Sequence, residues 1–175
     1  MLRAFGRVVG GIVSVVTLVS PSVHAEANGP HASVIGSRVR GATPAIARLV
    51  EHGIRRSPTF AALVAALNRS DVIVYIDITP QLPAGIDGRL AFATSAGGVR
   101  YLHAQVAVGL GRDGTIAVAG HELQHALEVA ADPRVRDRDG LAVLYAVIGI
   151  PGARRDTYDT AAAQQAGRRV RSELS

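Results

Sequence analysis

The residues best suited to chemistry in this 175-residue chain are His121, Glu122 and His125. On a helix, residues four apart differ by about 40° in direction and about 6 Å along the axis. Both imidazoles would therefore project from one face and could bind the same metal ion. Glu122 would lie on the flank of that face, where its carboxylate can take a proton from a metal-activated water. This spacing predicts a zinc site that includes its own general base.

The residues around this triplet are mostly apolar, which predicts a buried helix rather than a surface helix. A buried histidine or glutamate without a partner is costly, so a bound metal ion would explain why they are there. The alternative is a helix that carries two histidines and a glutamate without any metal. The apolar neighbours are Ile116, Val118, Ala119, Leu123, Ala126 and Leu127.

The segment Gly120-His121-Glu122-Leu123-Gln124-His125 resembles the active-site helix of the zincin metallopeptidases. The resemblance covers residues 71–175, where a small sheet precedes the motif helix and further helices follow it. It implies zinc-dependent cleavage of peptides or proteins, with Glu122 taking a proton from the attacking water and passing it to the leaving amine. No histidine follows His125, so the three-histidine site of metzincins is absent. The chain is closest to a minimal gluzincin-like domain.

A carboxylate must then supply the third ligand. Glu128 is seven residues after His121, so it points the same way but lies about 7 Å further along the helix than the expected metal position. We therefore expect Glu128 either to orient His125 or to be an ordinary helix acid.

Gluzincins take the third ligand from a later helix, and Asp159 is the matching residue here. It is spaced to share the apolar stripe of a last helix expected from about Thr157 to Leu174, so it should face inward. We predict Asp159 as the third ligand, and three other acids remain alternatives: Asp137, Asp139 and Asp156. The donor that would stabilise the oxyanion stays open among Tyr101, His103, Tyr145 and Tyr158.

The N-terminus has the pattern of a secretory signal peptide. Arg3 and Arg7 precede a short apolar run, and a small-x-small sequence ends at Ala25. The run is too short for a spanning helix, which needs about 20 residues. We expect residues 1–25 to be removed, residues 26–42 to be a flexible lead-in and residues 43–175 to form the metal-binding domain. The mature protein would be periplasmic or extracellular and not membrane-spanning.

Composition excludes several other functions. The chain has no cysteine, so disulfides, thiolate zinc sites and a cysteine nucleophile are impossible. All 19 basic residues are arginines and the formal net charge is +5. No nucleic-acid motif accompanies these arginines, so we expect solvated helix faces and no nucleic-acid binding. An anionic surface partner is the alternative. The oligomeric state is not specified by the sequence.

Periodicity predicts an α+β fold with about five helices and a small antiparallel three-stranded sheet. Two helices start at Thr43-Pro44 and Ser57-Pro58, where a capping residue precedes a proline. Alternating apolar residues predict strands over 71–78, 89–94 and 99–108, with a hairpin at Gly97-Gly98. Three helices follow: the motif helix, capped by Thr115 and ending at Asp132-Pro133, a short helix capped by Asp139, and the last helix, opened by Asp156.

Two functions from different classes agree with these patterns. The first is an exported zinc metallopeptidase with Glu122 as general base. The second is a zincin-like module that binds zinc without catalysis and serves as an interaction domain of the cell envelope.

Overall fold

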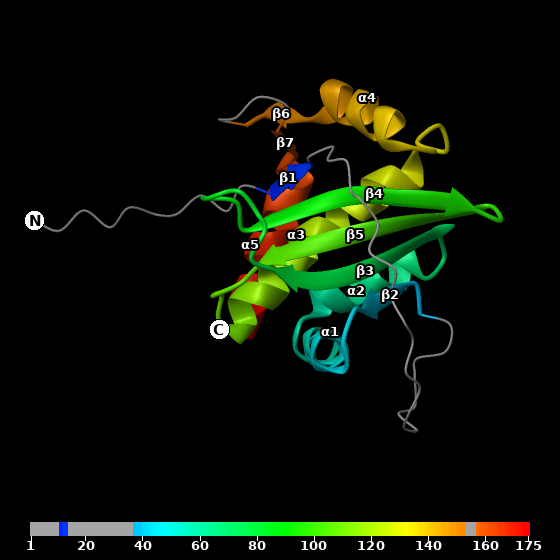
Figure 1. Ribbon diagram of the computed structural model, residues 1–175. Coiled ribbons are helices and arrows are strands. Elements are labelled where there is room, and N and C mark those ends of the chain that lie inside the picture. The colour runs from blue at the N-terminus through cyan, green and yellow to red at the C-terminus, as the bar shows by residue number, and fades with distance from the viewer. Residues whose placement is uncertain (1–10, 14–36, 153–156) are drawn as a thin grey trace, which may run out of the picture.

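The computed structural model describes residues 11–13, 37–152 and 157–175, which form an α+β fold. Its main sheet has the strand order β1-β4-β5-β3-β2. The strands β2–β5 make up the body of this sheet, and the three-residue β1 adds to the edge of β4 (Figure 1). The strands are β1 (Gly11–Val13), β2 (Val39–Gly41), β3 (Val72–Thr79), β4 (Gly88–Ala96) and β5 (Val99–Ala107).

The main sheet is mixed, so the prediction of a three-stranded antiparallel sheet is wrong. Strands β4 and β5 form the predicted hairpin, and both turn glycines, Gly97 and Gly98, have positive φ. Strand β5 also pairs with β3, but in parallel, and β3 pairs in parallel with β2. The helical connection between β2 and β3 provides the crossover that parallel neighbours need. Periodicity tells which residues share a face of a strand, but it does not tell which strands become neighbours.

Five helices accompany the strands in the described part of the chain. Both N-terminal helix predictions are confirmed, because the side chains of Thr43 and Ser57 accept hydrogen bonds from the backbone N–H groups of Ile46 and Phe60. In Figure 1, α1, α2, α3 and α5 lie behind the sheet and α4 lies beyond its β4 edge. The helices are α1 (Pro44–Arg56), α2 (Pro58–Leu67), α3 (Arg112–Ala131), α4 (Arg138–Ile148) and α5 (Ala161–Leu174).

Three predicted helix starts are wrong. Helix α3 begins at Arg112, and Thr115 is a buried residue inside it whose hydroxyl donates to the carbonyls of Leu110 and Gly111. Helix α4 is capped by Asp137 rather than by Asp139. Helix α5 begins only after Thr160, its N-cap. For α4 and α5, several polar residues near the start could cap the helix, and packing decides which one does. For α3 the N-cap is Gly111, which makes no side-chain capping bond and therefore left no capping signal in the sequence.

The segment before α5 is a strand rather than the first turn of a helix. Tyr158–Asp159 form β7, which pairs antiparallel with β6 (Ile150–Pro151) in a small second sheet. Asp156 lies outside the described residues. Asp159 is therefore held by a strand, and the helical spacing from which its inward direction was predicted does not apply.

The core lies between the main sheet and the helices behind it. Helix α3 runs through its centre, covered by the sheet on one side and by α5 on the other, and is buried nearly all round. Gly167 of α5 permits the close contact with α3, since a Cβ there would lie 3.2 Å from Cβ of His121. The motif helix is thus enclosed on all sides, as its apolar composition predicts.

Only some of the predictions for the N-terminus fall on residues that the structure describes. Residues 1–10 and 14–36 lie outside the described part of the chain. The described residues 11–13 fall within the predicted signal peptide and form β1, which pairs in parallel with Gly88–Leu90 of β4. The flexible lead-in was predicted too long, because Val39–Gly41 form β2. Three residues are too few for a period to be seen in the sequence.

Candidate metal centre

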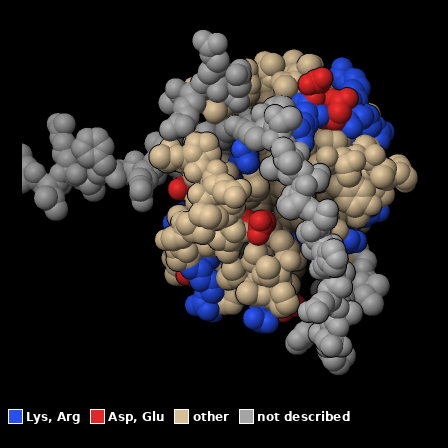
Figure 2. Space-filling view, viewed as in Figure 1, with Lys and Arg blue, Asp and Glu red and all other residues tan. Residues whose placement is uncertain are grey.

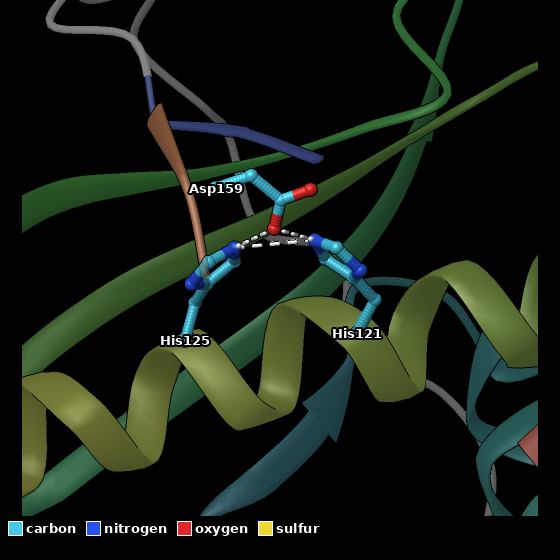
Figure 3. Close-up of side chains that lie close together, drawn as sticks. All are labelled: His121, His125 and Asp159. Carbon is cyan, nitrogen blue, oxygen red and sulfur yellow. Dashed lines mark hydrogen bonds and ion pairs between the residues drawn. The ribbon is translucent and has the colours of Figure 1, made fainter. Parts of the chain in front are cut away.

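His121 and His125 project side by side from α3, as their spacing predicts. Their side chains are almost fully buried, and their Nε2 atoms lie 3.1 Å apart (Figure 3). Neither nitrogen faces solvent. Each Nε2 atom therefore needs a partner inside the protein, which can be the other histidine, through a shared proton, or a third group.

Asp159 supplies that third group from β7. Its Oδ1 atom lies 3.2 Å from Nε2 of His121 and 3.6 Å from Nε2 of His125. Figure 3 shows the carboxylate entering between the two rings from the side opposite α3. The other oxygen, Oδ2, accepts a hydrogen bond from the Gln164 amide at 3.0 Å, which leaves Oδ1 to face the histidines. The structure thus brings together the three residues predicted as ligands.

The separations among these three atoms fit a tetrahedral zinc ion. Zinc binds histidine nitrogen and carboxylate oxygen at about 2.0–2.2 Å, so neighbouring tetrahedral ligands lie about 3.3–3.5 Å apart. The observed separations, 3.1, 3.2 and 3.6 Å, bracket that value. Two imidazoles and one carboxylate are also a donor set typical of catalytic zinc, with the fourth position left for water or substrate. Among the described residues, this group is the one whose histidine and acidic atoms converge closely enough for a metal ion.

Glu122 lies beside this group and is fully buried. Neither of its carboxylate oxygens has a hydrogen-bond partner in the described part of the structure. Burial raises the pKa of Glu122 to about 7, although the two neighbouring histidines oppose the shift. A carboxylate with a pKa near neutrality is suited to exchange protons at physiological pH. Orphaned buried oxygens are what a general base aimed at a reacting water would show.

Gly88 on β4 makes room for Glu122. A Cβ at this position would lie 2.4 Å from Oε1 of Glu122 and 2.5 Å from Cγ1 of Val118. The first residue of β4 therefore has to be a glycine for the carboxylate to occupy its place. The Glu122 carboxylate thus lies against the start of β4, where this strand pairs with β1.

Glu128 connects the centre to three structural elements. Its Oε2 lies 2.8 Å from Nδ1 of His125 and accepts from the Tyr145 hydroxyl of α4 at 3.1 Å. Its Oε1 accepts from the hydroxyl of Thr160 at 2.6 Å, next to Asp159. Of the two predicted roles, this geometry agrees with orientation of His125. A proton on Nδ1, donated to Glu128, leaves the lone pair of Nε2 free for a metal.

Each charged group of the centre shifts the pKa values of its neighbours in the direction that favours opposite charges. Burial alone would raise the pKa of Asp159, but hydrogen bonds from His121 and His125 lower it well below its usual range. Burial would lower the pKa of His125, but its bonds to Asp159 and Glu128 raise it to about 9. Burial would also raise the pKa of Glu128, yet the bond from His125 lowers it. Without metal, a proton on His125 therefore takes the place of the cation.

The other predicted candidates lie elsewhere. Asp137 caps α4, Asp139 is exposed in its first turn and neither approaches the histidines within ion-pairing distance. Among the possible donors, His103 is on the face of β5 opposite the buried core residues and stacks on Tyr75, with ring centroids 5.9 Å apart. Tyr101 is on that same face, so neither residue points toward α3. The Tyr145 hydroxyl is bound to Glu128, whereas Tyr158 lies next to Asp159 and stays a candidate.

Sequence reasoning missed Thr160, Gln164 and Gly88. Thr160 carried a signal, since a threonine before an alanine-rich run is a typical N-cap. Its second hydrogen bond, to Glu128, joins residues 32 positions apart, and no local sequence pattern indicates it. The same holds for Gln164 and Gly88, which reach the centre only because the chain folds back onto α3.

Most of the face in Figure 2 is uncharged. A groove of about 470 Å³ between the C-terminal end of α3 and α4 borders Glu128 but none of the three candidate ligands. No helix in the described ranges is both long and apolar enough to cross a bilayer.

Comparison with known proteins gives no further indication: no family model matches the chain, and no curated protein or solved structure is significantly similar to it.

Proposed function

We propose that this protein is an exported zinc-dependent hydrolase that cleaves peptide bonds. The observation that carries the proposal is the convergence of Nε2 of His121, Nε2 of His125 and Oδ1 of Asp159 at tetrahedral spacing beside the orphaned carboxylate of Glu122. His121, His125 and Asp159 would hold the ion. When bound, zinc supplies Lewis acidity, which acidifies water and polarises a carbonyl group.

The protein's own residues account for the proton transfers. Glu122 is buried beside the histidines, and its pKa of about 7 lets it accept a proton from the attacking water and release it later to the leaving amine. Glu128 holds His125 in one orientation through Nδ1, and Gln164 does the same for Asp159 through Oδ2. The ligands are thus fixed in advance, so little reorganisation is needed during the reaction.

A path for the substrate is compatible with the fold. Glu122 lies against Gly88 at the β4 edge of the main sheet, and β1 pairs with that edge. Because β1 lies within the predicted signal peptide, cleavage after Ala25 would free the backbone of Gly88–Leu90. An extended peptide could then approach Glu122 along the same edge.

The second candidate is a module that binds zinc without turnover. The enclosure of the three candidate ligands favours it, because their exposed fractions are 1%, 0% and 7% for His121, His125 and Asp159. Closed sites are typical of structural zinc, whereas a catalytic ion needs an accessible fourth position. The orphaned oxygens of Glu122 favour catalysis, since a purely structural site needs no such group.

The two candidates are separated by zinc content and peptide cleavage in the Glu122→Gln variant. We expect one zinc ion per chain in both the unmodified protein and the variant, because Glu122 is not a ligand. Cleavage of a mixed peptide library should fall by about 10²–10⁴-fold in the variant. Zinc without cleavage in the unmodified protein would support the inactive module, and absence of stoichiometric zinc would contradict both.

A matched pair of aspartate variants tests the third ligand. Asp159→Asn should lose zinc affinity, because the amide oxygen is neutral and a weaker ligand. Asp139→Asn removes the same charge from an exposed position of α4 and should bind zinc normally. Equal zinc affinity in the two variants would exclude Asp159 as a ligand.

A further inference from the structure

A groove lined by cationic side chains lies between α1 and the first turn of α3, away from the metal centre. It encloses about 350 Å³, at the lower end of the range of about 300–1,000 Å³ typical of ligand sites. Figure 2 shows basic side chains at the lower end of the visible face, where Figure 1 places α1. The residues that line this α1–α3 groove are Ala45, Arg48, Leu49, His52, Arg55 and Arg112.

The α1–α3 groove follows from helix spacing and from one glycine. Arg48, His52 and Arg55 are four and three residues apart, so they form one stripe along α1. On its buried side, Gly53 contacts α3, where a Cβ would lie 2.9 Å from Cγ2 of Ile116. This close approach brings the first turn of α3, and with it Arg112, alongside the stripe.

The positive charges of the α1–α3 groove lack compensation. No acidic residue lines it, and Arg48 and Arg55 form no ion pair with any described residue. Arg112 pairs only with its neighbour Asp113 at 3.6 Å, and both side chains are at least half exposed. Such an exposed pair contributes little. The three arginines that line the groove therefore give it a positive potential, which attracts anions.

We infer that the α1–α3 groove binds a phosphate group. Guanidinium groups form paired hydrogen bonds that match the oxygens of phosphate, and three of them supply enough donors for one such group. The phosphate can belong to a soluble phosphate ester or to a lipid headgroup, which share this chemistry. Arg112 lies nine residues, about 14 Å, before His121 on the same helix, so the groove is separate from the metal centre and does not depend on its function.

The test is phosphate titration of the full chain, freed of metal so that phosphate cannot bind zinc. Isothermal calorimetry with inorganic phosphate, against chloride at equal ionic strength, should show saturable binding at one site. The double variant Arg48→Gln/Arg55→Gln should bind at least about tenfold more weakly, because charge-assisted hydrogen bonds are lost. The control Arg134→Gln/Arg136→Gln removes the same charge at the other end of α3, where both side chains are exposed, and should bind like the unmodified protein.

A second arm identifies the source of the phosphate. Phosphatidylcholine vesicles with and without phosphatidic acid are sedimented with the same three proteins: the unmodified chain and the two double variants. Retention on phosphatidic acid that is lost only in Arg48→Gln/Arg55→Gln assigns a lipid headgroup, whereas binding of inorganic phosphate without retention assigns a soluble ester. The inference is overturned if neither ligand distinguishes the two double variants, because binding would then reflect net charge alone.

Discussion

Replacing Glu128 with glutamine should weaken zinc binding although Glu128 does not approach the metal position. The change keeps the shape of the side chain but turns a charged acceptor for Nδ1 of His125 into a neutral one. A hydrogen bond to a charged group contributes about 1.5–3 kcal/mol and a neutral one about 0.5–1.5 kcal/mol. The difference, about 1–1.5 kcal/mol, corresponds to about a tenfold loss of zinc affinity.

Two further variants calibrate this effect. Glu128→Ala removes the acceptor of His125, Tyr145 and Thr160 together and should cost about 100-fold, at the upper end of the effects measured for groups that support metal ligands. Tyr145→Phe removes one donor to Glu128 but keeps the aromatic ring, which packs edge-on against His125 with centroids 5.2 Å apart. Its effect should be only a few-fold.

Zinc affinity is measured by competition with a chelating indicator, and the fold of each metal-free variant is checked by its thermal midpoint. If Glu128→Gln binds zinc as tightly as the unmodified protein, Glu128 is an ordinary helix acid and the tautomer argument fails. A loss of affinity that parallels a loss of fold would equally refute a specific role in orientation.

Four other outcomes are expected. Gly88→Ala should lower peptide cleavage at least about tenfold with zinc content unchanged, which activity assays with metal analysis can measure. The reason is that the added Cβ would lie 2.4 Å from Oε1 of Glu122 and would displace the carboxylate. In metal-free protein, the pKa of Glu122 is raised from 4.5 to about 7, so between these pH values the folded state holds a proton that the unfolded state has lost. The free energy of unfolding should therefore fall by about 3 kcal/mol as the pH rises from about 4.5 to above 7. In denaturant titrations, Glu122→Gln should remove this pH dependence. Zinc affinity should rise about tenfold per pH unit up to about pH 9, as measured by chelator competition across pH. The reason is that the pKa of His125 is raised to about 9, so its proton must leave before zinc binds. Arg100→Met should destabilise the fold by about 3–5 kcal/mol in urea unfolding, since this buried guanidinium pairs with Asp71 and holds carbonyls at the end of α3.

The first two outcomes have natural controls. Gly114→Ala, also a glycine-to-alanine change, adds a Cβ whose nearest neighbour is Leu110 Cβ at 3.6 Å, so cleavage should be unaffected. Glu51→Gln neutralises an exposed glutamate and should leave the pH dependence of stability intact. Changes of equal size in either control would mean that the effects at Gly88 and Glu122 are not specific.

The local features of this protein were determined by its sequence. The four-residue spacing of His121 and His125 requires only a helix to place both rings on one face, and the apolar residues around them require that helix to be buried. The caps Thr43 and Ser57 and the hairpin glycines Gly97 and Gly98 act within a few residues, so they too could be predicted. The α+β class followed from the order of these periodic segments.

The tertiary structure alone decided what depends on contacts between distant residues. The parallel pairing of β3 with β5 follows from how the strands pack and not from their periodicity. Asp159 reaches the histidines from a strand, and Thr160 joins it to Glu128, because α5 folds back across α3. Several carboxylates could have been the third ligand by composition. The free energy of packing these distant segments brings Asp159 next to the two histidines, and no short-range pattern contains that information.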